Sequence, residues 1–223
     1  MMRVLSVVWF KVLPPKYGGQ KGTALFNQAL APYVELTCIC SKNNVATGEE
    51  SYAIIPTLPV TKLQLLNPIC WYRIIRQAQK VRPDFLFLEY PYHGIAALLA
   101  QKITGGKLVL HQHNIEFSRF KALGKWWWPL LFNYERWICK KADLVLCKTE
   151  KDFQSAHRYF NIARAKSLIV PYGISPGALT ETRINIRQLY NILPEEKIFL
   201  FAGTLDYSPN ADAVENIYNL LAP

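Results

Sequence analysis

Short apolar runs alternate with segments of helical periodicity along most of the chain. Runs that are apolar at nearly every position, such as Phe85–Leu88, are typical of parallel strands covered on both faces. The alternation of strand and helix predicts an α/β fold with an open parallel sheet, in which ligands bind at the carboxyl ends of the strands. The predicted strands are 4–10, 34–40, 52–55, 85–88, 107–110, 144–147 and 167–170, and the predicted helices are 22–30, 71–81, 95–103, 130–142 and 150–160.

The end of the chain repeats the arrangement found at its beginning. At the start, an apolar run is followed by a turn with paired glycines and a helix; near the end, the run Ile198–Ala202 is followed by Gly203 and a helical segment, 210–221. Two such starts predict two Rossmann-like domains, because one α/β domain usually takes about 100 to 200 residues. We expect an N-terminal domain over 1–175, an interdomain connection over 176–196 with a short helix at 184–190, and the first elements of a second domain over 197–223.

Composition and charge exclude several classes of protein. The chain is 51% hydrophobic and 19% charged, which predicts a folded globular protein and not a disordered one. The formal net charge of +10 predicts attraction to anions, but no long block of like charge resembles a nucleic-acid-binding tail, so no nucleic-acid partner is expected. A signal peptide is not expected, and no stretch approaches the roughly 20 apolar residues of a membrane span.

The cysteine pattern gives no indication of a metal site. Five cysteines occur without a CxxC or Cys/His spacing of the kind that binds zinc. We interpret them as reduced, mostly buried thiols, which favours a cytoplasmic location.

The glycine pair near the N-terminus is the first candidate site. In the turn Lys16-Tyr17-Gly18-Gly19, glycines let backbone amides approach a ligand, and the following helix presents a positive dipole end. Both features suit a phosphate, although a plain tight turn requires the same residues. The dinucleotide fingerprint GxGxxG is absent, which argues against a nucleotide-dependent epimerase or dehydrogenase.

The segment LVLHQHNIE is the second candidate site. His111 and His113 follow a buried strand and share one side of it if the strand continues that far, so either can point at the ligand crevice. A histidine there can exchange a proton with a sugar hydroxyl or polarise a substrate; the alternative is a histidine that is hydrogen-bonded inside the fold. The chain has four histidines and no cysteine pair beside these two, so we expect no metal.

The stretch 119–137, rich in basic and aromatic residues, is the third candidate site. Tryptophan favours membrane interfaces, and lysine and arginine are attracted to anionic lipid, so this stretch is a candidate contact with a membrane surface. In the alternative interpretation, Trp126–Leu131 packs under the sheet and the basic residues only solvate its rim.

Five motifs follow one another along the chain. They are Gly18-Gly19, the HNxE at His113–Glu116, Ala142-Asp143 before a buried strand, PYGI at Pro171–Ile174, and FAGTLDYSPNADAV at Phe201–Val214. Their order resembles that of the GT-B glycosyltransferases of family 4, also called glycosyl transferase group 1. The last motif is similar to that of bacterial enzymes that build exopolysaccharide or other envelope glycans.

The resemblance implies two Rossmann-like domains that face each other across a cleft, with the acceptor on the N-terminal domain and the nucleotide sugar on the C-terminal one. It implies retention at the anomeric carbon, no obligatory metal and no cofactor beyond the nucleotide-sugar substrate. It also implies that His113 is the catalytic residue beside the transferred sugar. Carried over by position, the donor contacts are Gly18, Gly19, Gly203 and Thr204, and the acceptor contacts are Asn114, Glu116 and Tyr90.

Two departures from the family pattern lead to an expectation about activity. Thr204 follows Gly203 where many relatives carry an arginine, and Asn210 stands near the place of a lysine. The family's paired donor-binding glutamates would fall after Pro223, so we expect a truncated or split enzyme that is inactive alone. The expected acceptor is a glycan or a lipid-linked sugar at the inner face of the membrane. The alternative is a non-catalytic binding module or pseudo-enzyme half that requires a partner chain.

Overall fold

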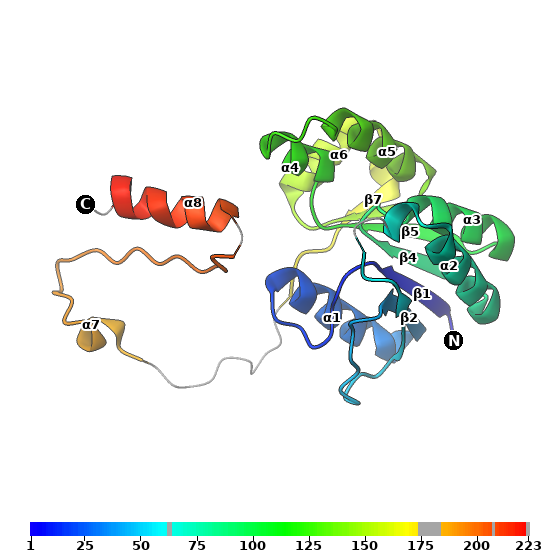
Figure 1. Ribbon diagram of the computed structural model, residues 1–223, viewed down its shortest axis with the longest axis horizontal. Helices are drawn as coiled ribbons and strands as arrows, with labels where there is room; N and C mark the ends of the chain where they lie inside the picture. The colour runs from blue at the N-terminus through cyan, green and yellow to red at the C-terminus, as the bar shows by residue number, and fades with distance from the viewer. Residues whose placement is uncertain (62–63, 174–183, 207, 222–223) are drawn as a thin grey trace. The chain divides into compact units, whose positions relative to one another are not determined.

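The computed structural model describes residues 1–61, 64–173, 184–206 and 208–221, and it divides into two compact units, Met1–Gly173 and Ile174–Pro223. Each unit is described by itself (Figure 1). The predicted domain boundary at residue 175 lies outside the described residues.

A seven-stranded sheet organises the first unit, in the order β3-β2-β1-β4-β5-β6-β7. Every neighbouring pair is parallel, so the predicted α/β class is confirmed. The chain runs outward in both directions from the β1 and β4 pair, and such a switch point opens a ligand crevice at the carboxyl edge of the sheet. The strands are β1 (Arg3–Val8), β2 (Glu35–Ser41), β3 (Ala53–Leu58), β4 (Phe85–Glu89), β5 (Lys107–Gln112), β6 (Leu144–Cys147) and β7 (Ser167–Ile169).

Two hydrophobic cores lie on opposite faces of this sheet. Leu86 and Leu108 belong to the core that includes residues of α2, α3, α5 and α6. Val4 and Cys38 belong to the other core, against which α1 packs, and Figure 1 shows α1 across the sheet from α2 and α3. The helices of this unit are α1 (Gly18–Leu30), α2 (Pro68–Val81), α3 (Gly94–Thr104), α4 (Glu116–Ala122), α5 (Trp128–Lys141) and α6 (Glu150–Phe160).

The third predicted strand and the second predicted helix had wrong bounds. The strand does not end at residue 55 but continues through Pro56; β3 is an edge strand, and an edge tolerates a residue without an amide hydrogen. The second helix starts at Pro68 and not at Trp71, because the Asn67 side chain accepts a hydrogen bond from the Ile69 amide and proline suits the first turn. Helix α4 was not predicted at all.

The second unit contains α7 (Ile186–Leu189), α8 (Ser208–Asn216) and a π-helical turn, Ile217–Leu221. The predicted strand 198–202 is not formed. A strand requires a hydrogen-bonded neighbour, and no other strand occurs among the described residues of this unit. Phe199 and Leu200 are therefore largely exposed.

Candidate active site

Strand alternation gathers four polar side chains on the face of the sheet that α1 covers. Leu88 and Leu110 face the larger core, so their neighbours Glu89 and His111, which are paired in register across β4 and β5, face the other way. His113 lies two residues beyond His111 and points to the same side. Lys148 follows Cys147, which also faces the larger core, and it therefore joins this group at the carboxyl edge.

Glu89 binds both histidines through its two carboxylate oxygens. Its Oε1 lies 3.0 Å from His111 Nδ1 and its Oε2 lies 2.5 Å from His113 Nε2, and all three side chains are fully buried. Burial alone would raise the pKa of Glu89, but its interactions with His111 and His113 hold it well below its usual range. An ionised carboxylate only accepts hydrogen bonds, so His111 carries its proton on Nδ1 and His113 carries its proton on Nε2.

The other nitrogen of His113 faces a hydroxyl. Its Nδ1 lies 2.9 Å from the Tyr172 hydroxyl, which donates to the remaining lone pair. Burial lowers the pKa of His113, although Glu89 opposes the effect, so the imidazole is neutral at pH 7. The ring is fixed by Tyr90, which stacks on it at 4.4 Å with an interplanar angle of 12°. Tyr90 has φ of 65°, a strained conformation for a residue other than glycine.

Tyr172 and Lys148 close the same side of the site. A Cβ atom added at Gly22 of α1 would overlap the Tyr172 ring, so this glycine makes room for the tyrosine. Lys148 is 4% exposed, and its Nζ lies 4.5 Å from the centre of the Tyr172 ring and 5.7 Å from that of Phe26. Burial lowers the pKa of Lys148, and the charge of Glu89 opposes this change.

The glycine pair begins α1 and is not the turn before it. The predicted helix start at Gly22 was wrong, because Gly18 and Gly19 are the first two helical residues. The Gln20 side chain accepts hydrogen bonds from the amides of Lys16 and Tyr17, at 2.7 and 3.3 Å, and thereby orders the start of the helix. The first amides of a helix lack intrahelical partners and remain available to an anion.

Tyr90 connects the glycine pair with His113. A Cβ atom at Gly19 would lie 3.9 Å from the Tyr90 hydroxyl, whereas one at Gly18 would meet nothing within 4 Å. The Tyr90 hydroxyl thus lies by Gly19, while the Tyr90 ring stacks on His113. The two candidate segments therefore lie at the same edge of the sheet.

The HNxE segment is held by buried carboxylates. Asn114 is exposed, and its Nδ2 lies 3.4 Å from Oε1 of the buried Glu116. Oε2 of Glu116 binds Arg119 Nη2 at 2.6 Å and accepts a hydrogen bond from the Tyr92 hydroxyl. Its carboxylate is thus already occupied by neighbours from the same unit, and its acceptor-binding role stays a prediction.

Glu135 of α5 holds the start of α4. Its carboxylate accepts hydrogen bonds from the amides of Glu116 and Phe117, both at 2.9 Å, and from Gln112 Nε2 at 2.6 Å. It therefore caps a helix that lies elsewhere in the sequence. Burial raises the pKa of Glu135 to about 7.

Gly203 and Thr204 lie in the second unit, in exposed backbone before α8. The Thr204 carbonyl accepts a hydrogen bond from Asn210 Nδ2 at 2.9 Å. A Cβ atom at Gly203 would come within 2.8 Å of that nitrogen and 2.9 Å of the Phe201 ring, so only glycine fits without a shift. Their donor-binding roles stay predictions.

One cluster in the described part of the chain has the composition of a metal site. Glu89, His111 and His113 each offer a ligand atom, and these atoms lie within 4.8 Å of one another. Here His111 Nδ1 and His113 Nε2 each donate a hydrogen bond to Glu89. These hydrogen bonds hold the cluster together in place of a metal ion. That the chain requires no metal stays a prediction.

Sequence reasoning missed Glu89, Lys148 and Tyr172. A signal existed for the first two, since each is a charged residue directly at the carboxyl end of a buried strand. Tyr172 belongs to the PYGI motif, but its contact with His113 could not be predicted because it joins positions 59 residues apart.

Comparison with known proteins identifies a glycosyltransferase family. The family described as Glycosyltransferase Family 4 matches residues 23–177. No curated protein matches the chain.

Three solved structures with the same fold share little sequence with this chain. Anabaena HepE in complex with UDP is 14% identical with a TM-score of 0.55, over 78% of this chain and 44% of that one. Sucrose-phosphate synthase from Thermosynechococcus elongatus is 13% identical with a TM-score of 0.60, over 77% and 49%. A glycosyltransferase from Rickettsia africae is 18% identical with a TM-score of 0.56, over 87% and 50%. The matched region thus spans half or less of the length of these proteins.

Proposed function

We propose, from the premise that this chain belongs to glycosyltransferase family 4, that it supplies the acceptor-side half of a retaining glycosyltransferase. The enzyme would transfer a sugar from a nucleotide-sugar donor to a glycan or lipid-linked acceptor in the synthesis of a bacterial envelope polysaccharide. The observation that carries the proposal is the position of His113, which is buried beside the glycine-started helix α1 at the ligand edge of a parallel sheet.

The protonation of His113 suits this role. Glu89 accepts a hydrogen bond from the Nε2–H group of His113 and fixes the ring. The Nδ1 atom therefore presents its lone pair to the Tyr172 hydroxyl. A neutral imidazole in that state can accept a hydrogen bond from a sugar hydroxyl, or a proton if one is released. His111 is less suited, because its ring lies against Phe26, with ring centres 4.7 Å apart, and no hydroxyl among the described residues contacts its Nε2.

For the donor, we propose a nucleotide sugar whose diphosphate is approached by Gly18 and Gly19, with Gly203 and Thr204 on the nucleotide side. Solved HepE structures contain UDP or UDP-glucose, which supports a nucleotide sugar here. No metal or separate cofactor is proposed, since amides at a helix start can stabilise a diphosphate. The proposed acceptor contacts are Tyr90, Asn114 and Glu116.

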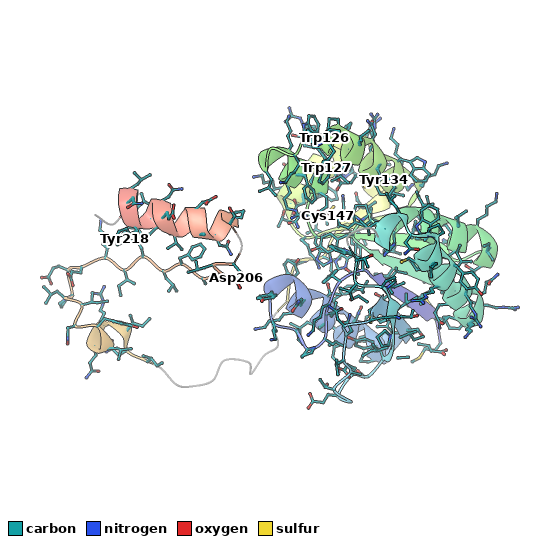
Figure 2. The ribbon with its side chains drawn as sticks, in the orientation of Figure 1. Trp126, Trp127, Tyr134, Cys147, Asp206 and Tyr218 are labelled. Carbon is teal, nitrogen blue, oxygen red and sulfur yellow. The ribbon has the colours of Figure 1, made fainter. Side chains whose placement is uncertain are left out.

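We also propose that the protein lies on the inner face of the cytoplasmic membrane. In Figure 2, Trp126 and Trp127 lie near α4 and α5; Trp126 is 83% exposed, whereas Trp127 packs on the core. Exposed Leu130 and the lysines 121 and 125 lie in the same stretch. An exposed indole beside lysines suits an anionic lipid surface. No helix among the described residues is long and apolar enough to cross a membrane.

A second candidate is a non-catalytic binding module that requires a partner chain. The exposure of Phe199 and Leu200 in the second unit favours it, because an unpaired apolar segment can add to another chain's sheet. In both cases we propose that the isolated 223-residue chain does not turn over substrate.

A transfer assay tests the proposal. The chain alone and a version joined to a complete donor-binding domain would be incubated with nucleotide sugars and a lipid-linked acceptor. We expect glycosylated product only with the two-domain version. Product from the chain alone would contradict its proposed inactivity, and no product from the two-domain version over a broad donor panel would favour the binding module.

A further inference from the structure

We propose that Lys148 is an anion-binding residue of this site and holds a phosphoryl group of the substrate. The choice of a phosphoryl group rests on the proposed function, since both the nucleotide sugar and a lipid-linked sugar carry diphosphate. The assignment of Lys148 itself comes from its position and from its lack of a partner.

Lys148 occupies the place in the sheet that adjoins His113. Strands β5 and β6 pair up to Gln112 and Cys147, and the next residue of each strand is His113 or Lys148. The positive charge of Lys148 contributes to the lowered pKa of His113, and the negative charge of Glu89 acts on Lys148 in turn. An anion that binds this ammonium would therefore lie beside the imidazole.

The side chain of Lys148 is nearly buried, and its ammonium has no hydrogen bond within the part of the chain that the structure describes. Among the described residues no acceptor and no carboxylate pairs with this ammonium, and it lies over the ring faces of Phe26 and Tyr172. Lysine is rarely buried unless it is paired, and aromatic faces replace only part of its hydration. A strained or unsatisfied group that persists at a ligand crevice is typical of a binding site.

The neighbouring helix start is not the anion site. The Thr149 side chain caps the Asp152 amide at 3.0 Å, and Glu150 and Asp152 place negative charge in the first turn of α6. These carboxylates would repel a phosphate at that end. The first turn of α1, the helix that brings Phe26 to Lys148, contains no acidic residue.

The test compares Lys148→Met, which keeps the stem and removes the charge, with Lys148→Arg, which keeps the charge. Lys151→Met is the matched control, because Lys151 is exposed in the first turn of α6, three residues after Lys148. Calorimetric titration of each 223-residue variant with inorganic diphosphate reports binding without glycosyl transfer. We expect Lys148→Met to weaken binding roughly tenfold or more, and the other two variants to stay within about threefold of the unaltered chain.

Thermal unfolding of the same variants separates binding from stability. An unpaired buried charge costs stability, so we expect Lys148→Met to leave Tm unchanged or to raise it. A fall in Tm with unchanged diphosphate affinity would make Lys148 a structural partner of Glu89 and overturn the inference. So would absence of diphosphate binding by the unaltered chain, or equal losses in Lys148→Met and Lys151→Met.

Two further titrations distinguish the source of the phosphoryl group. If the site holds the donor, UDP binds more tightly than inorganic diphosphate, and its binding depends on Lys148. If the site holds the acceptor, the binding of a short polyprenyl diphosphate in detergent depends on Lys148 instead. If diphosphate binding does not depend on Lys148 but the two-domain version transfers sugar, the anion site is wrong and the transferase proposal stands. If binding depends on Lys148 but the two-domain version transfers no sugar, the anion site stands and the transferase proposal is contradicted.

Discussion

Glu89 determines how the two histidines behave, because one buried carboxylate accepts a hydrogen bond from each. A lone ionised carboxylate in this position would be expensive to bury, and the paired donors offset that cost. The same contacts place the His113 proton on the side away from Tyr172. The reactive property of His113, a lone pair at Nδ1 that accepts a hydrogen bond from the Tyr172 hydroxyl, is therefore set by a residue on the neighbouring strand.

Two glycines of α1 give a matched stability test. Alanine at Gly18 meets no atom within 4 Å, whereas alanine at Gly22 would overlap the Tyr172 ring. Alanine favours a helix over glycine by up to about 1 kcal/mol, so Gly18→Ala is expected to raise the free energy of unfolding by a few tenths to about 1 kcal/mol. Gly22→Ala is expected to show no gain or a loss, because the ring must move. Urea unfolding measures both variants; equal gains would mean that Tyr172 does not occupy its place beside Gly22.

At the scale of elements, α4 depends on a carboxylate from α5. The first amides of this short helix have no capping side chain of their own, and Glu135 supplies the acceptors. Because Gln112 donates to the same carboxylate, Glu135 ties the end of β5 to the start of α4 and fixes the HNxE segment between them.

Glu135 makes stability depend on pH. Its pKa of about 7 lies above the ordinary value of 4.5, so the folded chain holds more protons between these values, and nearby Glu116 acts in the same direction. The contribution of Glu135 to the free energy of unfolding is fully present below about pH 4.5. It is lost as pH rises to about 7, by on the order of 3 kcal/mol. We expect the unfolding free energy of the unaltered chain, relative to Glu135→Gln, to fall from about pH 5 to about pH 7.5. Parallel pH profiles in urea unfolding would contradict the assignment.

The exposed end of the α4 and α5 region carries the membrane prediction. Trp126→Ala is expected to reduce co-sedimentation with vesicles rich in anionic phospholipid, because it removes the one fully displayed indole of the Trp126–Trp128 run. Tyr33→Ala is the control, since Tyr33 is also largely exposed but lies after α1. Equal losses in both variants, or no binding by the unaltered chain, would exclude this surface as the membrane contact.

At the scale of the whole molecule, the sequence predicted most of the fold and only part of the site. Runs such as Leu144–Cys147 identified the strands, because a strand buried on both faces is apolar at every position. The segment 198–202 has the same pattern but forms no strand, since the pattern records burial and not the presence of a neighbour to pair with. Helix α4 was missed because its basic and aromatic residues obscure the periodicity and its cap lies in α5.

The site shows the same limit. His113 and the glycine pair were found because they follow strands, which local sequence reveals. Tyr172 and Glu135 were not, because each acts through a contact with a residue far away in the sequence. Pairing between distant positions is a property of the folded sheet and not of any short segment.

The most direct test of the account compares sugar transfer by His113→Ala and His111→Ala in a two-domain version of the enzyme. Both histidines bind Glu89, so each variant disturbs the same carboxylate, but of the two only His113 has its second ring nitrogen hydrogen-bonded to a hydroxyl, that of Tyr172. With folding confirmed by thermal unfolding, we expect kcat/KM to fall roughly 10²- to 10⁴-fold for His113→Ala and far less for His111→Ala. Equal losses, or a larger loss for His111→Ala, would contradict the claim that His113 is the reacting residue.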